Sequence, residues 1–129
     1  MPVFWHPKQE LKDAVEYGMH ALCLDEVPGR LIIEKQFDKT DRLGDSYFDG
    51  IDDYSIRLWD DDPSTVFHEL THIMQYANYE LEVYDEGHAY WKGETVEGLT
   101  YKDSPWEIEA YHIEKVLLKC FRAHYEKSS

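Results

Sequence analysis

The apolar residues in the first half of the chain predict one helix followed by three strands. The segment KQELKDAVEYGMHALCL follows Pro7 and carries apolar residues at helical spacing, which predicts a first helix there. From Arg30 to Phe37, adjacent isoleucines lie between segments rich in turn-forming residues, which indicates a strand. The segments DSYFDG and DYSIRLW flank residues 50–52, so we expect them to pair as antiparallel strands.

The second half of the chain opens with a helix that has a clear start signal. Asp62 can accept hydrogen bonds from free backbone amides and Pro63 suits the first helical position, so we expect a helix from Pro63 to about Asn78. Irregular hairpins over 81–101 and a last helix from Pro105 to about Tyr125 complete the expected elements. The apolar stripe of the first of these two helices consists of Val66, Leu70, Ile73 and Ala77, with Phe67 and Met74 beside it.

These elements indicate a single α+β domain over residues 1–129, with an N-terminal helix, a small, mixed and twisted β-sheet, and two later helices. A chain of 129 residues, 43% of them hydrophobic, has the size of one ordinary domain and can bury a continuous core. Cys23 and Cys120 both fall in apolar, helix-like surroundings. We therefore expect both to be buried thiols.

The charge of the chain limits the classes of partner. There are 27 Asp and Glu against 13 Lys and Arg, which gives a formal net charge of -14. This charge repels phosphate backbones and anionic membranes, so we expect neither nucleic acid nor a membrane as partner. It favours basic substrates, although surplus carboxylates also simply keep a small protein in solution. Because we find no secretory leader and no apolar segment of bilayer length, we expect a cytoplasmic protein.

The segment HELTH, residues 68–72, holds the most specific chemistry. Two histidines four apart lie on the same side of a helix, so His68 and His72 can each direct a ring nitrogen to one metal ion. Glu69 lies at the margin of that face, where it can act as a general base. The histidines lie roughly opposite the apolar stripe, so we expect them to line water or a cleft. In a chain rich in His and Glu this pattern also arises by chance, so it needs independent support.

A catalytic zinc site usually has three protein ligands, and the last helix offers the third. Ser104, Pro105 and Glu107 match a capping box, which gives Glu107 a structural role. Glu109 stands at the head of an expected apolar stripe, where a carboxylate is costly unless it is paired or bound to metal. We therefore expect Glu109 as the third ligand, and leave Glu107, His88 and His112 as alternatives. The expected apolar stripe comprises Ile113, Val116, Cys120 and Ala123, with Leu117 adjoining.

The segment HELTH, followed on a later helix by Glu109-Ala110, resembles the gluzincin group of zinc metallopeptidases. The chain is most similar to small single-domain metallopeptidases of bacteria and phages, because it also has Gln75 three residues after the second His and the segment PWEIEA at 105–110. A metzincin pattern is excluded, because Asn78 stands where the third His of that pattern would be. The resemblance implies a zincin-like fold, one zinc ion held by His68, His72 and Glu109, Glu69 as catalytic base, and a peptide or protein substrate.

The expected mechanism is hydrolysis of a peptide bond. Zinc lowers the pKa of bound water toward about 7, and Glu69 takes the water proton and passes it to the leaving amine. The substrate is expected to lie along an exposed strand at 46–49. Tyr90, Tyr101 and Tyr111 are candidate oxyanion donors, although ordinary packing also explains each of them.

The sequence leaves two points open. The thermolysin-like pattern places an acidic residue four after the ligand glutamate, where this chain has Ile113, so the groups that bond the outer nitrogens of the histidines are not identified. The rival interpretation is a non-catalytic protein in which zinc stabilises the fold, such as a structural or virion-associated protein. A purely structural site does not require Glu69, and structural zinc usually has four protein ligands, so we favour the enzyme.

Overall fold

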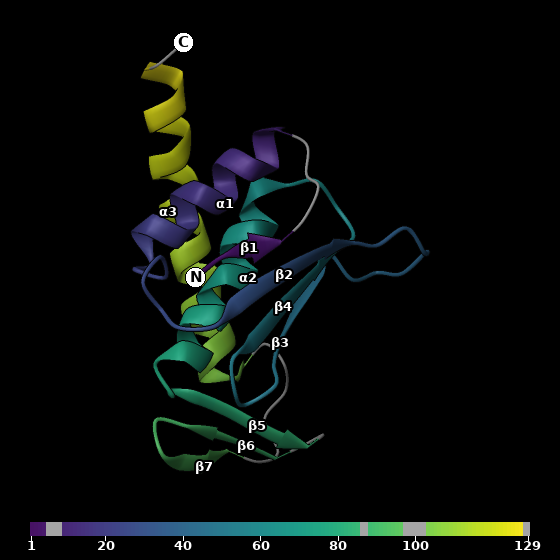
Figure 1. Cartoon of the computed structure of the whole chain (residues 1–129), viewed down its shortest axis with the longest axis vertical. Coiled ribbons are helices and arrows are strands. Elements are labelled where there is room, and N and C mark those ends of the chain that lie inside the picture. Colours follow the sequence, from purple (N-terminus) through teal and green to yellow (C-terminus); the bar gives the residue numbers. More distant parts are fainter. Residues whose placement is uncertain (5–8, 86–87, 97–102, 128–129) are drawn as a thin grey trace.

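The computed structural model describes residues 1–4, 9–85, 88–96 and 103–127, which form three helices and two β-sheets (Figure 1). The helices are α1 (Gln9–Ala21), α2 (Pro63–Ala77) and α3 (Pro105–Lys127). The first sheet contains β1 (Val3–Phe4), β2 (Arg30–Lys35), β3 (Gly44–Phe48) and β4 (Asp53–Leu58), and the second contains β5 (Leu81–Asp85), β6 (His88–Trp91) and β7 (Glu94–Val96). The α+β class is confirmed, and the short strand β1 is the element that the sequence pattern did not indicate.

The first sheet is mixed, with strand order β1-β2-β4-β3. Strands β1, β2 and β4 run parallel, whereas β3 pairs antiparallel with β4 and forms an edge. The antiparallel pairing of DSYFDG with DYSIRLW is thereby confirmed. In β4, Tyr54, Ile56 and Leu58 are buried, because alternate side chains of a strand point to the same face. That face packs against the helices and forms one side of the core.

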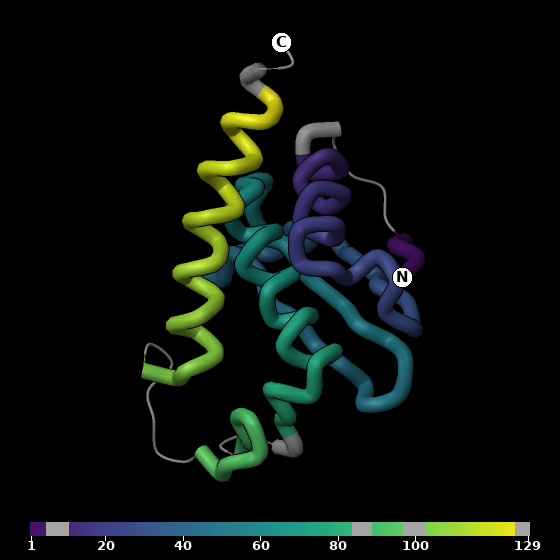
Figure 2. The backbone as a smooth tube through the Cα atoms, turned by 90° about the vertical axis from the view of Figure 1, so that its left-hand side faces the viewer, coloured from purple at the N-terminus to yellow at the C-terminus, as the bar shows by residue number. Residues whose placement is uncertain are grey.

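Helix α2 lies at the centre of the molecule. As expected, the Asp62 side chain caps it, accepting a hydrogen bond from the amide of Ser64 at 2.9 Å, and Pro63 is its first residue. The predicted apolar residues Val66, Phe67, Leu70 and Ile73 are all buried. The rings of Tyr17 in α1, Phe67 in α2 and Phe121 in α3 lie with centroids 5.4–6.3 Å apart. This aromatic cluster joins the three helices, which lie side by side in Figure 2.

The second sheet forms a separate antiparallel layer, with strand order β5-β6-β7, at the C-terminal end of α2 (Figure 1). Lys92 and Gly93 form the two-residue turn between β6 and β7 with φ of 51° and 84°, as a type I′ hairpin requires. The ring of Trp91 lies 6.2 Å from that of Trp106 at the start of α3. Strand β5 continues from α2 and contacts it. The irregular hairpins expected after α2 are therefore present in the described residues.

The prediction of two buried thiols is wrong, because Cys23 and Cys120 are both exposed. Cys23 follows the last turn of α1 with φ of 58°, and the buried residue at that chain reversal is Leu24. Cys120 lies on the outer face of α3, away from the buried Phe121. None of the helices in the described ranges is long and apolar enough to cross a membrane.

Gly44 allows the edge strand β3 to lie close to α2. A Cβ atom at this position would come within 2.8 Å of Thr65 Cγ2 and 3.1 Å of Glu69 Cγ. Real Cβ atoms essentially never approach within 2.8 Å, so a larger residue at Gly44 requires either the Thr65 side chain or the strand to shift. The absence of a side chain at Gly44 therefore sets the distance between β3 and the helix that carries HELTH.

We predict that Gly44→Ala lowers the free energy of unfolding by about 1–3 kcal/mol, because the added methyl group overpacks the contact with Thr65. Thr65→Ser removes Cγ2 but keeps the hydroxyl that donates to Asp60 at 2.9 Å. Combined with Gly44→Ala, it should recover part of the loss. Denaturant unfolding of the two single variants and the double variant measures this coupling, and additive effects would contradict the proposed contact.

Candidate metal centre

His68 and His72 lie on one face of α2 and meet at their Nε2 atoms. They are four residues apart, so they follow one another along the same side of the helix. The two Nε2 atoms lie 3.2 Å apart, and the rings are buried, with 6% and 7% exposure. The opposite face of α2 carries the apolar stripe, so the same helix packs into the core with one side and presents both imidazoles with the other.

A carboxylate from α3 completes the cluster, and it belongs to Glu107. Its Oε1 lies 3.4 Å from His68 Nε2 and makes a close contact with His72 Nε2. Glu107 is only 1% exposed. These three residues each offer a ligand atom, and the atoms lie within 4.8 Å of one another. Buried charge is costly unless it is compensated, so a carboxylate here requires a partner of positive charge.

Glu109, which the sequence predicts as the third ligand, lies outside this cluster. The Oε1 atom of Glu109 accepts a hydrogen bond from Gln75 Nε2 at 3.1 Å, and Glu109 is absent from the described groups of metal-ligating atoms. Glu107, which the sequence analysis kept as an alternative, occupies the position assigned to Glu109. The amides of Glu107 and Ile108 bond the carbonyl of Ser104, so the helix start lies where it was expected.

The inward face of α3 differs from the apolar stripe that the sequence predicted. The predicted stripe includes Val116, which is 48% exposed, and Cys120, which is also exposed. The inward face carries Glu107 and Glu114, which are not apolar. Hydrophobic periodicity therefore did not indicate that face. These two carboxylates lie inward because they meet the histidines. The face that packs inward carries Glu107, Ala110, Glu114, Leu117 and Phe121, at spacings of three and four.

The outer nitrogens of both histidines have acceptors, which settles the point that the sequence left open. His68 Nδ1 donates to Glu114 Oε1 at 2.9 Å, because a carboxylate only accepts. Gln75 Nε2 donates to the carbonyl of Trp106 at 3.0 Å. The Oε1 atom of Gln75 therefore faces His72, and His72 Nδ1 donates to this Oε1 at 2.8 Å. Both rings are thereby held with Nδ1 protonated and Nε2 directed at Glu107.

The electrostatics of the cluster favour a cation. Burial alone would lower the pKa of His68, but the hydrogen bond and charge of Glu107, the charge of Glu69 and the hydrogen bond of Glu114 outweigh it and raise the pKa to about 9. Three carboxylates therefore stabilise positive charge at this imidazole. A divalent ion held by His68, His72 and Glu107 would supply the same charge without protonating the ring.

The distances in the cluster fit a metal ion. Ligand atoms at 2.0–2.1 Å from a tetrahedral ion lie about 3.3 Å from each other. Two of the three separations match that edge length: 3.2 Å between the imidazole nitrogens and 3.4 Å from His68 to Glu107. The contact between His72 Nε2 and Glu107 is closer than such an edge. The cluster can therefore hold a metal ion once His72 and Glu107 move apart. Three protein donors, instead of four, are typical of a catalytic site.

The cluster lies in a cleft of about 670 Å³ between β3, β5 and the two helices. Glu69, Tyr76 and Tyr111 also line it. Burial raises the pKa of Glu69, although the positive charges of His72 and His68 and a hydrogen bond with Ser46 act in the opposite direction. Burial and the nearby charges of Glu69 and Glu107 raise the pKa of Tyr76 to about 12. Glu69 is therefore a buried carboxylate that faces the cleft beside the metal ligands.

The remaining candidates from the sequence lie elsewhere or pack differently. The ring of Tyr111 lies 4.6 Å from that of His68 inside the cleft, whereas Tyr90 does not line it. His112 is exposed on α3 and is not part of the cluster. The side chain of His88 and the whole of Tyr101 lie outside the described residues.

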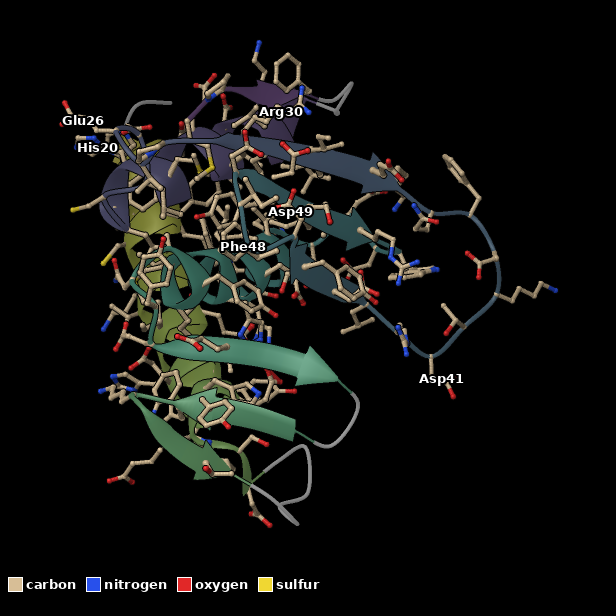
Figure 3. All side chains as sticks on the ribbon, turned by 60° about the horizontal axis from the view of Figure 1, so that its bottom comes forward. His20, Glu26, Arg30, Asp41, Phe48 and Asp49 are labelled. Carbon is tan, nitrogen blue, oxygen red and sulfur yellow. The ribbon has the colours of Figure 1, made fainter. Side chains whose placement is uncertain are left out.

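A second acidic group lies in the turn between β3 and β4, where Asp49, Asp52 and Asp53 gather. Figure 3 labels Asp49 at this turn. Asp49 Oδ1 accepts hydrogen bonds from three successive backbone amides, and Arg30 bonds Asp53 through two nitrogens. The turn itself thus accounts for these carboxylates.

We predict that Glu107→Gln weakens zinc binding by more than about 100-fold, because it removes a charged ligand, whereas the matched variant Glu109→Gln leaves the affinity within about threefold. Competition with a chromogenic chelator measures both dissociation constants. The assignment of Glu107 is wrong if the two variants change affinity equally, or if Glu109→Gln has the larger effect.

Comparisons of this chain with protein-family models, with curated proteins and with solved structures gave no match. The candidate centre is therefore defined by the residues and geometry of this chain. It consists of His68, His72 and Glu107 as possible metal ligands, with Glu69 beside them in the cleft.

Proposed function

We propose that this protein is a zinc-dependent metallopeptidase with a zincin-like fold. The observation that carries the proposal is the meeting of His68, His72 and Glu107 at the floor of a cleft that Glu69 also lines. Two imidazoles and one carboxylate are the ligand set of one class of catalytic zinc sites. Zinc held there supplies Lewis acidity, which lowers the pKa of water toward about 7 and polarises a peptide carbonyl.

Glu69 is the general base in this proposal. Its burial raises its pKa, and a base whose pKa lies nearer neutrality accepts a proton more readily at physiological pH. It takes a proton from the attacking water as the oxygen bonds to the carbonyl carbon. It then passes that proton to the amine nitrogen as the carbon–nitrogen bond breaks.

Gln75 and Glu114 act as positioning residues in this proposal. Each holds the Nδ1–H of one histidine, so the Nε2 lone pairs remain available to the ion. Gln75 is fully buried and also donates to the Trp106 carbonyl and to Glu109, so it joins the start of α3 to α2. The resemblance to gluzincins in HELTH and Gln75 is consistent with these roles.

Strand β3 is the expected docking edge for the substrate. It lies at the edge of the first sheet and borders the cleft through Gly44, Asp45 and Ser46. An extended peptide can add to such an edge through main-chain hydrogen bonds. Tyr111 lies beside His68 in the same cleft, where its ring can contact a bound peptide.

The proposal predicts that Glu69→Gln abolishes hydrolysis without loss of zinc. Removing a general base costs about 10²–10⁴-fold in turnover, and the amide is the same size as the carboxylate. Zinc content and cleavage of fluorescently labelled casein are measured for the wild type and the variant. If wild type binds zinc but does not cleave casein or a peptide library, the rival interpretation as a zinc-stabilised structural protein is favoured.

A second prediction concerns Gln75. Gln75→Leu should weaken zinc binding by about 10–100-fold, because His72 loses the acceptor that fixes its tautomer. Gln75→Glu keeps an acceptor and should recover part of the affinity. Long-range ¹H–¹⁵N correlation spectra of the zinc-free protein report the His72 tautomer directly. An unchanged tautomer and unchanged zinc affinity in Gln75→Leu would refute this role, even if the variant were less stable.

A further inference from the structure

The cleft lies between the edges of two different sheets. Its lining includes Gly44 and Ser46 from β3 and Leu81 and Val83 from β5. Strand β3 is the last strand of the first sheet, and β5 is the first strand of the second. Figure 3 shows the two sheets one beside the other, with the loop that carries Asp41 projecting past the first. Each edge strand has a strand neighbour on one side only, within the described part of the chain.

The register of β3 directs the backbone groups of Gly44 and Ser46 away from β4. The amide of Trp59 bonds the carbonyl of Leu43, and the amide of Asp49 bonds the carbonyl of Asp53. In an antiparallel pair, hydrogen-bonded and non-bonded residue pairs alternate. The pairs Gly44–Leu58 and Ser46–Ile56 are therefore non-bonded, and their β3 members turn N–H and C=O toward the open edge.

Strand β5 has the same property on the other side of the cleft. The amide of Lys92 bonds the carbonyl of Glu80, so the next bonded pair is Glu82–Tyr90. Leu81 and Val83 pair with Trp91 and Ala89 as non-bonded positions, and their backbone groups point away from β6. Among the described residues, neither edge has a further strand partner, and both strands border the cleft that holds the candidate metal centre.

The side chains that border the cleft indicate the composition of its occupant. Leu43 and Val83 line it and are 60% and 56% exposed, so both walls offer apolar surface. Five carboxylates line the cleft against one guanidinium, that of Arg42. Asp45 is paired with Arg42 and also with Arg57, which lies outside the lining, so four carboxylates have no arginine partner in these pairs. A divalent ion compensates only part of this charge, so basic peptides are attracted and acidic ones are repelled. The carboxylates are those of Asp41, Asp45, Glu69, Glu107 and Glu114.

We propose that the occupant is an extended, basic peptide segment that lies as a strand between β3 and β5 and bonds the backbone of both. This inference rests on the proposed peptidase function and specifies its substrate class. Binding between two strands uses main-chain hydrogen bonds on both sides of the peptide. The backbone of the bound segment must therefore be accessible, so a folded substrate must first unfold locally. Docking on β3 alone would leave the outward groups of Leu81 and Val83 without a role.

Amide hydrogen exchange tests the two-edge arrangement. The protein is the Glu69→Gln variant, ¹⁵N-labelled and loaded with zinc. The probe is a pool of end-blocked octapeptides whose sequences are random combinations of Lys, Arg, Leu, Val and Gly. The amides of Ser46 and Val83 should both exchange at least about fivefold more slowly with the peptides present. Thr95 is the internal control, because its pairing with Tyr90 turns its amide to the far edge of the second sheet. A matched pool with Asp and Glu in place of Lys and Arg should protect neither edge.

A pair of proline variants provides a second measurement. Val83→Pro removes one amide that faces the cleft while keeping the bonds to β6, so peptide binding should weaken by about 3–10-fold with zinc content unchanged. Thr95→Pro makes the same change at the far edge and should leave binding as it is. If Val83→Pro does not fold, hydrogen exchange in the Glu69→Gln protein still decides the question.

The outcomes separate this inference from the proposed function. Protection of both Ser46 and Val83 by the basic pool supports two-edge binding. Protection of Ser46 alone, in a protein that binds zinc and whose wild type cleaves peptides, overturns two-edge binding and leaves the peptidase intact. Equal protection by both pools overturns the preference for basic peptides. Absence of zinc binding and of hydrolysis overturns the proposed function itself, and this inference with it.

Discussion

The contact between the Glu107 carboxylate and the imidazole pair is the interaction on which the site depends. It brings a buried negative charge from α3 to two histidines of α2, and such a charge requires a compensating positive charge, from a protonated imidazole or a bound cation. The same contact fixes how α3 lies against α2 at the end nearest the second sheet. At the other end, the rings of Phe67 and Phe121 hold the two helices together by ordinary packing. Packing and electrostatics therefore fix the same helix pair at two separate places.

The polar groups around this contact form one connected set. Glu114 and Gln75 hold the outer nitrogens of the histidines, and Gln75 also reaches the first turn of α3. Each of these side chains is positioned by a helix, which is more rigid than a loop. The edge strand β3 approaches α2 closely because Gly44 has no side chain. The cleft thus has walls of regular structure on each side of the candidate metal centre.

Most of the fold could be predicted from the sequence because local signals agree with the tertiary structure. The cap at Asp62, the stripe containing Leu70 and Ile73, and the strands around residues 50–52 all appear where they were expected. His68 and His72 were placed correctly on one helical face, since their spacing alone determines it. The pairing of β1 with β2 could not be predicted, because a two-residue strand has no periodicity.

The sequence favoured Glu109 over Glu107 for a physical reason. Hydrophobic periodicity locates a buried face by its apolar residues, and the buried face of α3 carries Glu107 and Glu114 where it meets the histidines. The pattern therefore led to the opposite face and to Glu109. The sequence signal for the inward face was a pair of carboxylates seven residues apart, Glu107 and Glu114. The outer-nitrogen partner Glu114 was missed for the same reason, whereas Gln75 was noted only through resemblance.

The most direct test of the central claim is anomalous diffraction at the zinc absorption edge from crystals of the zinc-loaded protein. The account predicts one strong anomalous peak per chain, bonded by His68 Nε2, His72 Nε2 and a carboxylate oxygen of Glu107, at about 2.0–2.2 Å. A peak bonded by Glu109, a peak at the Asp49 turn in place of this position, or no peak between the histidines would contradict it.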